Sequence, residues 1–166
     1  MEIRQLNRTD AEDYLSIRLE ALQSSPYAFA SSYEEEKNQT AEKYKNRFTT
    51  PANTFTFGAF EESQLVGVVT LITEQLIKLN HRANIVAMYI KPEKRGIGLG
   101  KDLILKVLEK AYRLEGIEQI YLSVVTTNIP AKKLYASCGF EIIGKEKRAL
   151  KIDNTYYDEE HMVLFL

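Results

Sequence analysis

The stretch that decides the fold of this 166-residue chain is Lys91-Pro92-Glu93-Lys94-Arg95-Gly96-Ile97-Gly98-Leu99-Gly100-Lys101. An apolar run rich in strand-favouring residues, from Asn84 to Ile90, comes directly before it. After it, apolar residues recur on one face with the period of a helix, at Leu99, Leu103, Val107 and Ala111. The sequence therefore predicts a glycine-rich turn between a strand and the N-terminus of a long helix.

Such a turn is suited to binding an anion. Glycines at alternate positions leave backbone N–H groups unshielded and allow dihedral angles closed to other residues. Those N–H groups and the positive end of the helix dipole suit a phosphate or pyrophosphate. A P-loop would need glycine and a hydroxyl residue where Arg95 and Asp102 stand, and a Rossmann fingerprint would need glycine at Lys101. The turn is therefore either an ordinary tight connection or a site for another phosphate-bearing ligand.

The composition is that of an ordinary globular protein, with 45% hydrophobic and 27% charged residues. Its length predicts a single domain over residues 1–166. The formal net charge of −1 gives no reason to expect a nucleic-acid or membrane partner. The chain has no long apolar run, no signal-peptide core at its start and one cysteine, Cys138, so we expect a cytoplasmic location.

The remaining pattern predicts short strands and helices. Thr9 and Glu12 have the spacing of a capping box, which predicts that a helix begins there and ends near Ser24. A strand after the long helix, Ile117 to Val125, completes a strand–helix–strand unit, which makes its two strands parallel. The polar run from Lys145 to Asn154 is expected to be a connection. Other predicted elements are strands at 2–6, 54–60, 64–73 and 140–144, a last strand in the apolar end of 156–166, and a helix at 41–48. Residues 61–63 are short enough to form a hairpin turn between two of these strands.

A second informative stretch follows, from Asn128 to Phe140. Asn128 can cap a helix, Pro130 suits the first helical turn, and Gly139 can end the helix. Its spacing is Asn-x-x-Ala-x-x-x-Tyr-x-x-x-Gly-Phe, with the tyrosine at Tyr135.

These two motifs resemble those of the GCN5-related N-acetyltransferase (GNAT) family. Arg95-x-x-Gly98-x-Gly100 is similar to the family's pyrophosphate loop, and the pattern ending at Phe140 is similar to its C-terminal motif. They stand in the family's order, separated by one helix and one strand. The resemblance implies an α/β (α+β) single-domain fold with flanking helices. Its mixed, mostly antiparallel sheet has a splayed parallel pair of strands, and acetyl-coenzyme A (acetyl-CoA) is the cosubstrate in their cleft.

The resemblance also implies roles for individual residues. The exposed backbone at Met88, Tyr89 and Ile90 would pair with the pantetheine arm, and Asn128 would hold that arm from the opposite side. Tyr135 would face the sulfur as the proton donor when the thiolate leaves. The pyrophosphate would be bound, chiefly through backbone amides, at Arg95, Gly96, Gly98, Gly100 and Lys101.

The implied reaction needs a deprotonated amine, a polarised thioester carbonyl and a protonated leaving group. A backbone N–H on the splayed strand can serve the carbonyl oxygen, and a tyrosine hydroxyl can donate the proton. The base is not identified by the sequence. Glu34, Glu35, Glu36 and Glu74 are chemically suitable, but solvated surface carboxylates explain them more simply. Two isolated histidines, His81 and His161, give no metal-ligand pattern, so we expect no metal.

We therefore predict a cytoplasmic N-acetyltransferase that moves an acetyl group from acetyl-CoA to a primary amine. The alternative is a catalytically silent acyl-CoA binding or sensing module, against which the presence of Tyr135 argues. The sequence does not identify the acceptor, which is a polyamine, an aminoglycoside, an amino acid, or a peptide or protein amine. It also does not decide whether the chain forms a homodimer. If Glu34, Glu35 and Glu36 turned inward, their carboxylates would attract a cationic acceptor.

Overall fold

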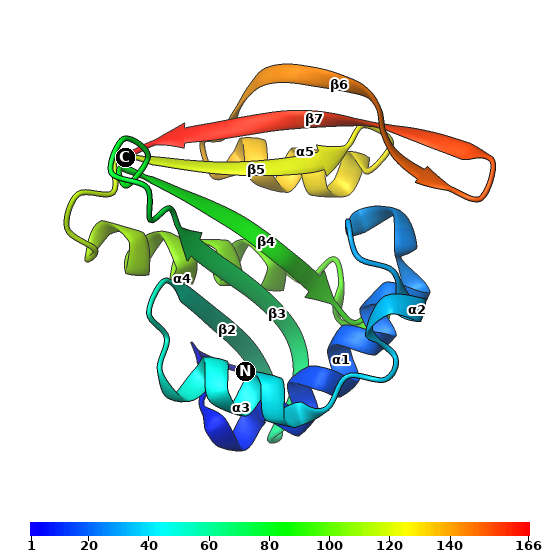
Figure 1. The fold of residues 1–166 in the computed structure, drawn as a ribbon, viewed down its shortest axis with the longest axis vertical. Helices are drawn as coiled ribbons and strands as arrows, with labels where there is room; N and C mark the ends of the chain where they lie inside the picture. The colour runs from blue at the N-terminus through cyan, green and yellow to red at the C-terminus, as the bar shows by residue number, and fades with distance from the viewer.

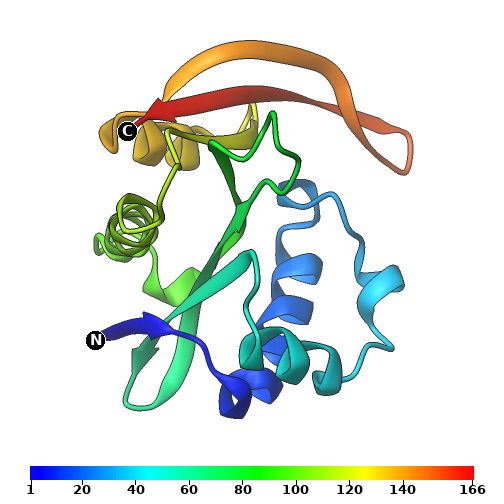
Figure 2. The same ribbon diagram turned by 60° about the vertical axis from the view of Figure 1, so that its left-hand side comes forward.

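The computed structural model describes residues 1–166 as one seven-stranded mixed sheet with helices on both of its faces (Figures 1 and 2). In chain order the elements are β1 (Glu2–Gln5), η1 (Arg8–Asp10), α1 (Ala11–Ser24), η2 (Pro26–Ala28), α2 (Tyr33–Glu36), α3 (Ala41–Thr49), β2 (Thr54–Glu61), β3 (Gln64–Thr73), β4 (Arg82–Ile90), η3 (Pro92–Lys94), α4 (Leu99–Tyr112), β5 (Gln119–Val125), α5 (Ile129–Ser137), β6 (Glu141–Ile152) and β7 (Thr155–Phe165).

The strand order is β1-β2-β3-β4-β5-β7-β6, and β4–β5 is the parallel pair. This confirms the predicted mixed, mostly antiparallel sheet. The two parallel strands are paired only where Arg82–Asn84 meets Gln119–Tyr121, and they then diverge (Figure 1). Beyond that point, the side of β4 that faces β5 has no strand partner.

A bulge in β4 explains the divergence. The register with β3 shifts between Val68 and Thr70, and Ala87 has a positive φ of 52°. An extra residue in one strand bends that strand and increases its local twist. The bend carries the second half of β4 away from β5, so a gap opens in the middle of the sheet.

The helices cover the sheet from two sides, and each side has its own apolar core. Helices α4 and α5 lie on one face and α1 to α3 on the other (Figure 2). On the first face α4 buries Leu103 and Val107 completely, and on the second Tyr14 and Tyr44 pack edge to face with ring centroids 4.7 Å apart. Full burial of such a side chain contributes about 1.5–3 kcal/mol, so these contacts fix the helices to the sheet.

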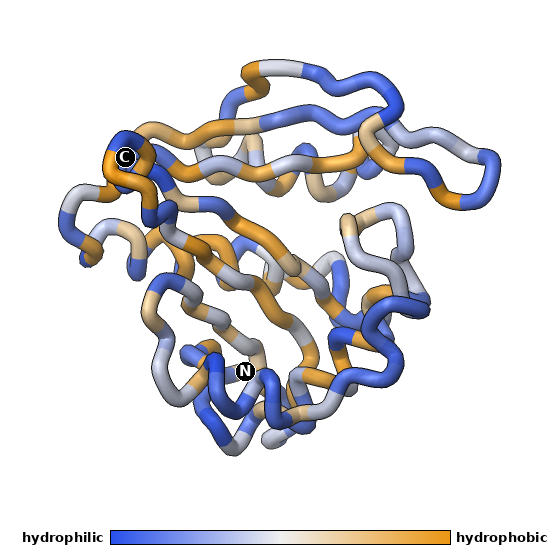
Figure 3. The backbone as a smooth tube through the Cα atoms, viewed as in Figure 1, coloured by the Kyte–Doolittle hydropathy of each residue, from blue (hydrophilic) through white to orange (hydrophobic).

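The prediction of a polar connection from Lys145 to Asn154 is wrong. Most of that run belongs to β6, which pairs with β7 in a long hairpin that turns at Asp153 and Asn154. Because β6 is an edge strand with both faces largely exposed, its side chains need no apolar alternation. The outer hairpin is accordingly hydrophilic along much of its length, whereas the central strands are apolar (Figure 3).

The predicted capping box is also wrong by two residues. Asn7, not Thr9, provides the cap: its Oδ1 accepts a hydrogen bond from the Thr9 N–H at 2.8 Å. The Asp10 carboxylate accepts from the Asn7 N–H at 2.7 Å and from the guanidinium of Arg4. Because Arg4 holds Asp10 in a buried position, a 3-10 turn forms before α1 begins at Ala11.

Other local predictions are confirmed. The hairpin turn between β2 and β3 lies at Glu62 and Ser63, both with positive φ, and Asn128 caps α5. None of the helices combines the length and apolar character needed to cross a membrane.

Candidate active site

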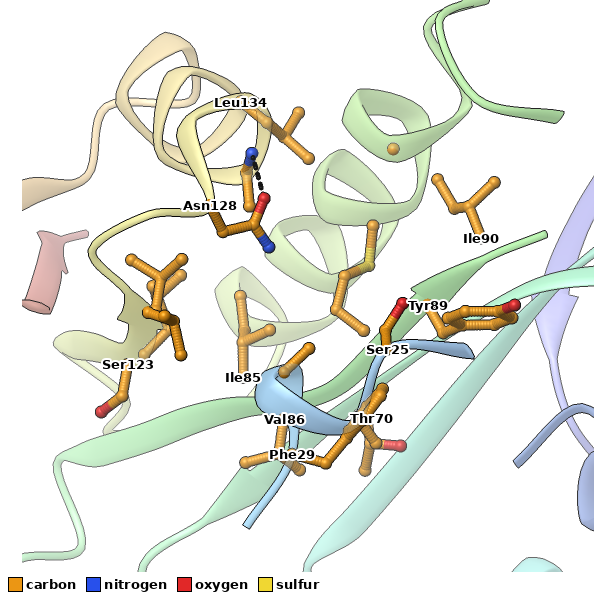
Figure 4. A pocket seen from close by; sticks show the side chains of 18 of the residues that line it. Ser25, Phe29, Thr70, Ile85, Val86, Tyr89, Ile90, Ser123, Asn128 and Leu134 are labelled. Carbon is orange, nitrogen blue, oxygen red and sulfur yellow. Dashed lines mark hydrogen bonds between the residues drawn. The ribbon is translucent and has the colours of Figure 1, made fainter. Parts of the chain in front are cut away.

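A cavity of about 1140 Å³ occupies the gap between β4 and β5 and reaches α3 and the segment that joins α1 to α2 (Figure 4). Its walls come from both halves of the chain, because the divergence of the two strands leaves room that no other element fills. All the residues expected from the sequence to bind the cosubstrate or donate a proton line it: Met88, Tyr89, Ile90, Arg95, Gly96, Gly98, Gly100, Lys101, Asn128 and Tyr135.

One end of the cavity is formed by the glycine-rich turn. Gly96 and Gly98 have φ values of 78° and 89°, in the left-handed region where a side chain is strained. The N–H groups of residues 96–100 donate no hydrogen bond within the protein. They precede or begin the fourteen-residue helix α4, whose dipole adds positive potential. This end of the cavity therefore has the donors and the field that an oxyanion needs.

Two residues of the turn also have roles within the protein that the sequence analysis did not predict. Gly100 has an ordinary φ, but a Cβ there would lie 3.0 Å from the Leu134 side chain, so glycine at this position lets α4 and α5 approach closely. The Arg95 side chain turns back, and its Nε donates to the Ile90 carbonyl oxygen at 2.9 Å. The Arg95 guanidinium therefore fixes the end of β4, and the Arg95 N–H donates to the Pro92 carbonyl oxygen at 3.3 Å. The free N–H groups of the turn begin at Gly96.

The middle of the cavity has polar groups on both walls. Asn128 accepts a hydrogen bond from the Ala131 N–H at 3.3 Å through Oδ1, and its amide nitrogen points into the cavity (Figure 4). On the opposite wall, the Tyr89 hydroxyl is hydrogen-bonded to Ser24 and to Glu20, at 2.9 Å each. The Tyr89 side chain is therefore engaged within the protein, and its backbone lies opposite Val68 of β3.

Tyr135 lies on α5 and is buried, with its ring packed edge to face on Phe140 at a centroid distance of 6.1 Å. Burial raises the pKa of Tyr135 to about 12, and no protein group forms a hydrogen bond with its hydroxyl. The hydroxyl is thus protonated at neutral pH and available to a ligand in the cavity, which is the state that a proton donor requires.

The acidic run beside α2 has three different environments. Glu36 points inward and forms a two-point ion pair with Arg18, with a shortest distance of 2.8 Å, and both side chains are 12% exposed. Glu34 is exposed and paired with Lys37, and Glu35 caps α2 through Ser32. The hypothesis that three carboxylates attract a cation is therefore wrong: one lines the cavity, and Arg18 neutralises its charge.

Removing the Glu36 charge tests this pairing. Glu36→Gln should lower the free energy of unfolding by about 1.5 kcal/mol, because Arg18 would lose a charged partner in a mostly buried position. The hydrogen bonds from Arg18 lower the pKa of Glu36. Its contribution is therefore present above the ordinary carboxylate pKa and is lost as the pH falls through the folded-state value. Urea unfolding at several pH values measures both effects.

Glu34→Gln is the matched control for that experiment. Because Glu34 is exposed, its replacement should change the unfolding free energy by less than about 0.5 kcal/mol. Equal losses in the two variants would show that the Arg18–Glu36 pair adds nothing beyond a surface pair.

Some cavity residues were not found from the sequence, among them Arg18, Arg47 and Glu159. Arg47 lies against the rings of Tyr14, Tyr44 and Phe48 at about 5 Å, and its buried Nε has no hydrogen-bond partner. No local signal separates these charged residues from those on the surface.

Glu74, a candidate base in the sequence analysis, lies outside the cavity and accepts a hydrogen bond from Asn84 at 2.8 Å. No group of three or more His, Cys, Asp and Glu side chains is placed to hold a metal ion.

The sequence is similar to those of known acetyltransferases. The profile of the acetyltransferase (GNAT) domain matches residues 3–161. Spermidine N(1)-acetyltransferase of Vibrio cholerae is 31% identical over 103 residues, which cover 62% of this chain and 58% of that protein. Spermidine N(1)-acetyltransferase of Thermoplasma acidophilum is 28% identical over 152 residues, 86% of this chain and 89% of that protein.

Among solved structures, the fold is similar to that of yncA from Salmonella typhimurium, determined with its cofactor acetyl-CoA. The TM-score is 0.86 at 18% identity, with 100% of this chain and 94% of that chain covered. At this identity the likeness shows the fold alone.

Proposed function

The chain belongs to the acetyltransferase (GNAT) family, and we propose that it transfers the acetyl group of acetyl-CoA to a primary amine with Tyr135 as the general acid. Members of this family are N-acetyltransferases that use acetyl-CoA. The observation that carries the proposal is the cavity in the splayed β4–β5 gap. It has free N–H groups at one end and an unpartnered tyrosine hydroxyl on its wall.

We assign the cosubstrate to the cavity by the chemistry of its walls. The N–H groups of residues 96–100 would bind the pyrophosphate, with Lys101 adding positive charge nearby. From Met88 to Ile90, β4 has no strand partner on its β5 side, and the backbone groups left free there would bond to the amides of the pantetheine arm. The Ile90 carbonyl oxygen is already bonded to Arg95. The Asn128 amide would contact the arm from the end of β5. A β4 N–H would polarise the thioester carbonyl.

The acceptor side suggests which amine to test first. Two relatives are named spermidine N(1)-acetyltransferases, so a polyamine is our first candidate. The walls there include Tyr27, Phe29 and Tyr44, which suit the apolar stem of a slender amine. Because Glu36 is neutralised by Arg18, attraction for the ammonium must come from another group in the cavity.

Turnover with a panel of amines tests the proposal. Spermidine, an aminoglycoside, an amino acid and a peptide with a free N-terminus would each be mixed with the protein and acetyl-CoA. We expect at least one of them to release free thiol above the rate without amine and to gain an acetyl group by mass spectrometry. If acetyl-CoA binds in calorimetry and no amine is acetylated, the chain is a binding module instead.

A further inference from the structure

We infer that Glu159 is the general base that takes a proton from the acceptor ammonium, an assignment that rests on the proposed acetyl transfer. Glu159 lies on β7 and lines the cavity. The inference is drawn from three features: the face of the sheet on which the side chain lies, its position along the splayed gap, and the lack of any partner for its charge.

The face is fixed by the neighbours of Glu159 along β7. Tyr157 stacks on Tyr27 of η2, with ring centroids 6.1 Å apart, and Glu160 forms an ion pair with Lys132 of α5 at 2.8 Å. Successive side chains of a strand point to opposite faces, so Glu159 shares the η2 face with Tyr157. Tyr135, on α5, belongs to the other face. A base and an acid on opposite sides of the gap suit a reaction in which the amine enters from one side and the thiolate leaves on the other.

The position along the gap is fixed by strand register. Glu159 pairs with Val125, the last residue of β5, where β4 and β5 no longer contact each other. Asn128, the residue that caps α5, follows three residues after Val125. Glu159 therefore lies at the wide end of the gap, near the residues that we assign to the pantetheine arm.

The charge of Glu159 is unpaired. Glu36 and Glu159 are the acidic residues that line the cavity, and only Glu36 has a cationic partner. Burial raises the pKa of Glu159, a nearby Glu146 also raises it, and His161 lowers it. His161 is itself hydrogen-bonded to Ser123 at 2.8 Å and to Glu146 at 3.1 Å. The groups facing Glu159 are thus Tyr157 and His161 on β7, Glu146 on β6, Ser123 on β5 and Tyr27 on η2.

The proposed step is balanced in protons and electrons. The ammonium gives one N–H proton to a Glu159 carboxylate oxygen, and the freed nitrogen lone pair forms the bond to the acetyl carbon. The carbon–sulfur bond breaks with its electron pair on sulfur, which takes the Tyr135 hydroxyl proton. The second amine proton leaves through water and restores Tyr135, while Glu159 returns its proton to solvent. One proton therefore ends on the thiol and one in solution.

Glu159→Gln tests the assignment with a paired set of acceptors. With the best amine of the panel at neutral pH, kcat/KM should fall about 10²-fold, the usual size of an acid–base effect. With a β,β-difluorinated analogue of that amine, much of which is unprotonated at neutral pH, the loss should be clearly smaller. A merely structural role would lower both rates equally, and so equal losses, or full activity with the ordinary amine, would overturn the assignment.

Two further measurements sharpen the test. A base acts above its pKa, so activity that depends on Glu159 is lost as the pH falls through the pKa of Glu159. His161 lowers this pKa, so His161→Gln should raise it. The fall of activity at acidic pH should therefore move to higher pH in that variant. Glu141→Gln, on the exposed part of the same hairpin, should leave rate and profile unchanged. An acidic limb unmoved in His161→Gln would count against Glu159.

A binding measurement separates failure of this inference from failure of the proposed function. If the wild-type protein acetylated no amine, the proposed function would fall. Calorimetry with coenzyme A and a diamine would still report on Glu159. If Glu159→Gln bound the diamine several-fold more weakly than the wild type, the result would support contact between Glu159 and the ammonium. Equal affinity in the two proteins would contradict that contact.

Discussion

Tyr135→Phe should reduce kcat by about 10²-fold or more while leaving the affinity for acetyl-CoA within about twofold. The substitution keeps the ring and its contact with Phe140 and removes only the hydroxyl, which has no partner in the protein. Stability should therefore change little, because no buried hydrogen bond is broken. Steady-state kinetics with thiol detection, together with calorimetry of cofactor binding, measures the two quantities separately.

The pH dependence of the wild-type enzyme gives the same hypothesis a second test. A general acid acts while it is protonated, and burial raises the pKa of Tyr135 to about 12. Activity that depends on this proton is kept below that pKa and lost only as the pH rises through it. We therefore expect kcat to show no descending limb below about pH 10.

Tyr121→Phe is the matched control, because Tyr121 lies on β5 outside the cavity and its hydroxyl donates only to Gln119. This variant should turn over like the wild type. Full turnover by Tyr135→Phe would show that water, or another group, protonates the leaving thiolate.

The parts of the fold that sequence reasoning predicted are those fixed by local chemistry. Gly98 needs a left-handed conformation at the start of a helix, and Asn128 has a side chain that caps one, so each marks its place without reference to distant residues. The glycine turn lies between the first strand and the helix of the strand–helix–strand unit, and Asn128 follows its second strand. Local chemistry can also mislead: Thr9 and Glu12 have the spacing of a capping box, but the more distant contact between Arg4 and Asp10 places the cap at Asn7.

What could not be predicted depends on contacts between segments far apart in the chain. Arg18 and Glu36 are 18 residues apart, so nothing in the run of three glutamates shows which one turns inward. Glu159 and Glu160 are adjacent in one strand and so lie on opposite faces, but only contacts with the distant Tyr27 and Lys132 show which face each one takes. The charged strand β6 lacks the apolar alternation that identifies strands, because backbone bonds to β7 hold it and solvent covers its side chains.

Gly98→Asp should weaken acetyl-CoA binding by about 10²-fold, about 2.7 kcal/mol. The new carboxylate would stand at the N-terminus of α4, among the N–H groups that we assign to the pyrophosphate, and would repel that anion. A side chain at a φ of 89° is strained as well, although nothing lies within 4 Å of the new Cβ to obstruct it. Calorimetry with acetyl-CoA measures the affinity.

Two controls separate the effect of charge from the effect of strain. Gly98→Ala has the same backbone strain without the charge, so the difference between the two variants at this position reports the electrostatic part. Gly116→Asp places the same residue at a φ of 82° in open space outside the cavity, and should reduce stability without changing the affinity. If Gly98→Asp is folded and binds acetyl-CoA as tightly as Gly116→Asp does, the pyrophosphate lies elsewhere, and the free N–H groups of this turn have another role.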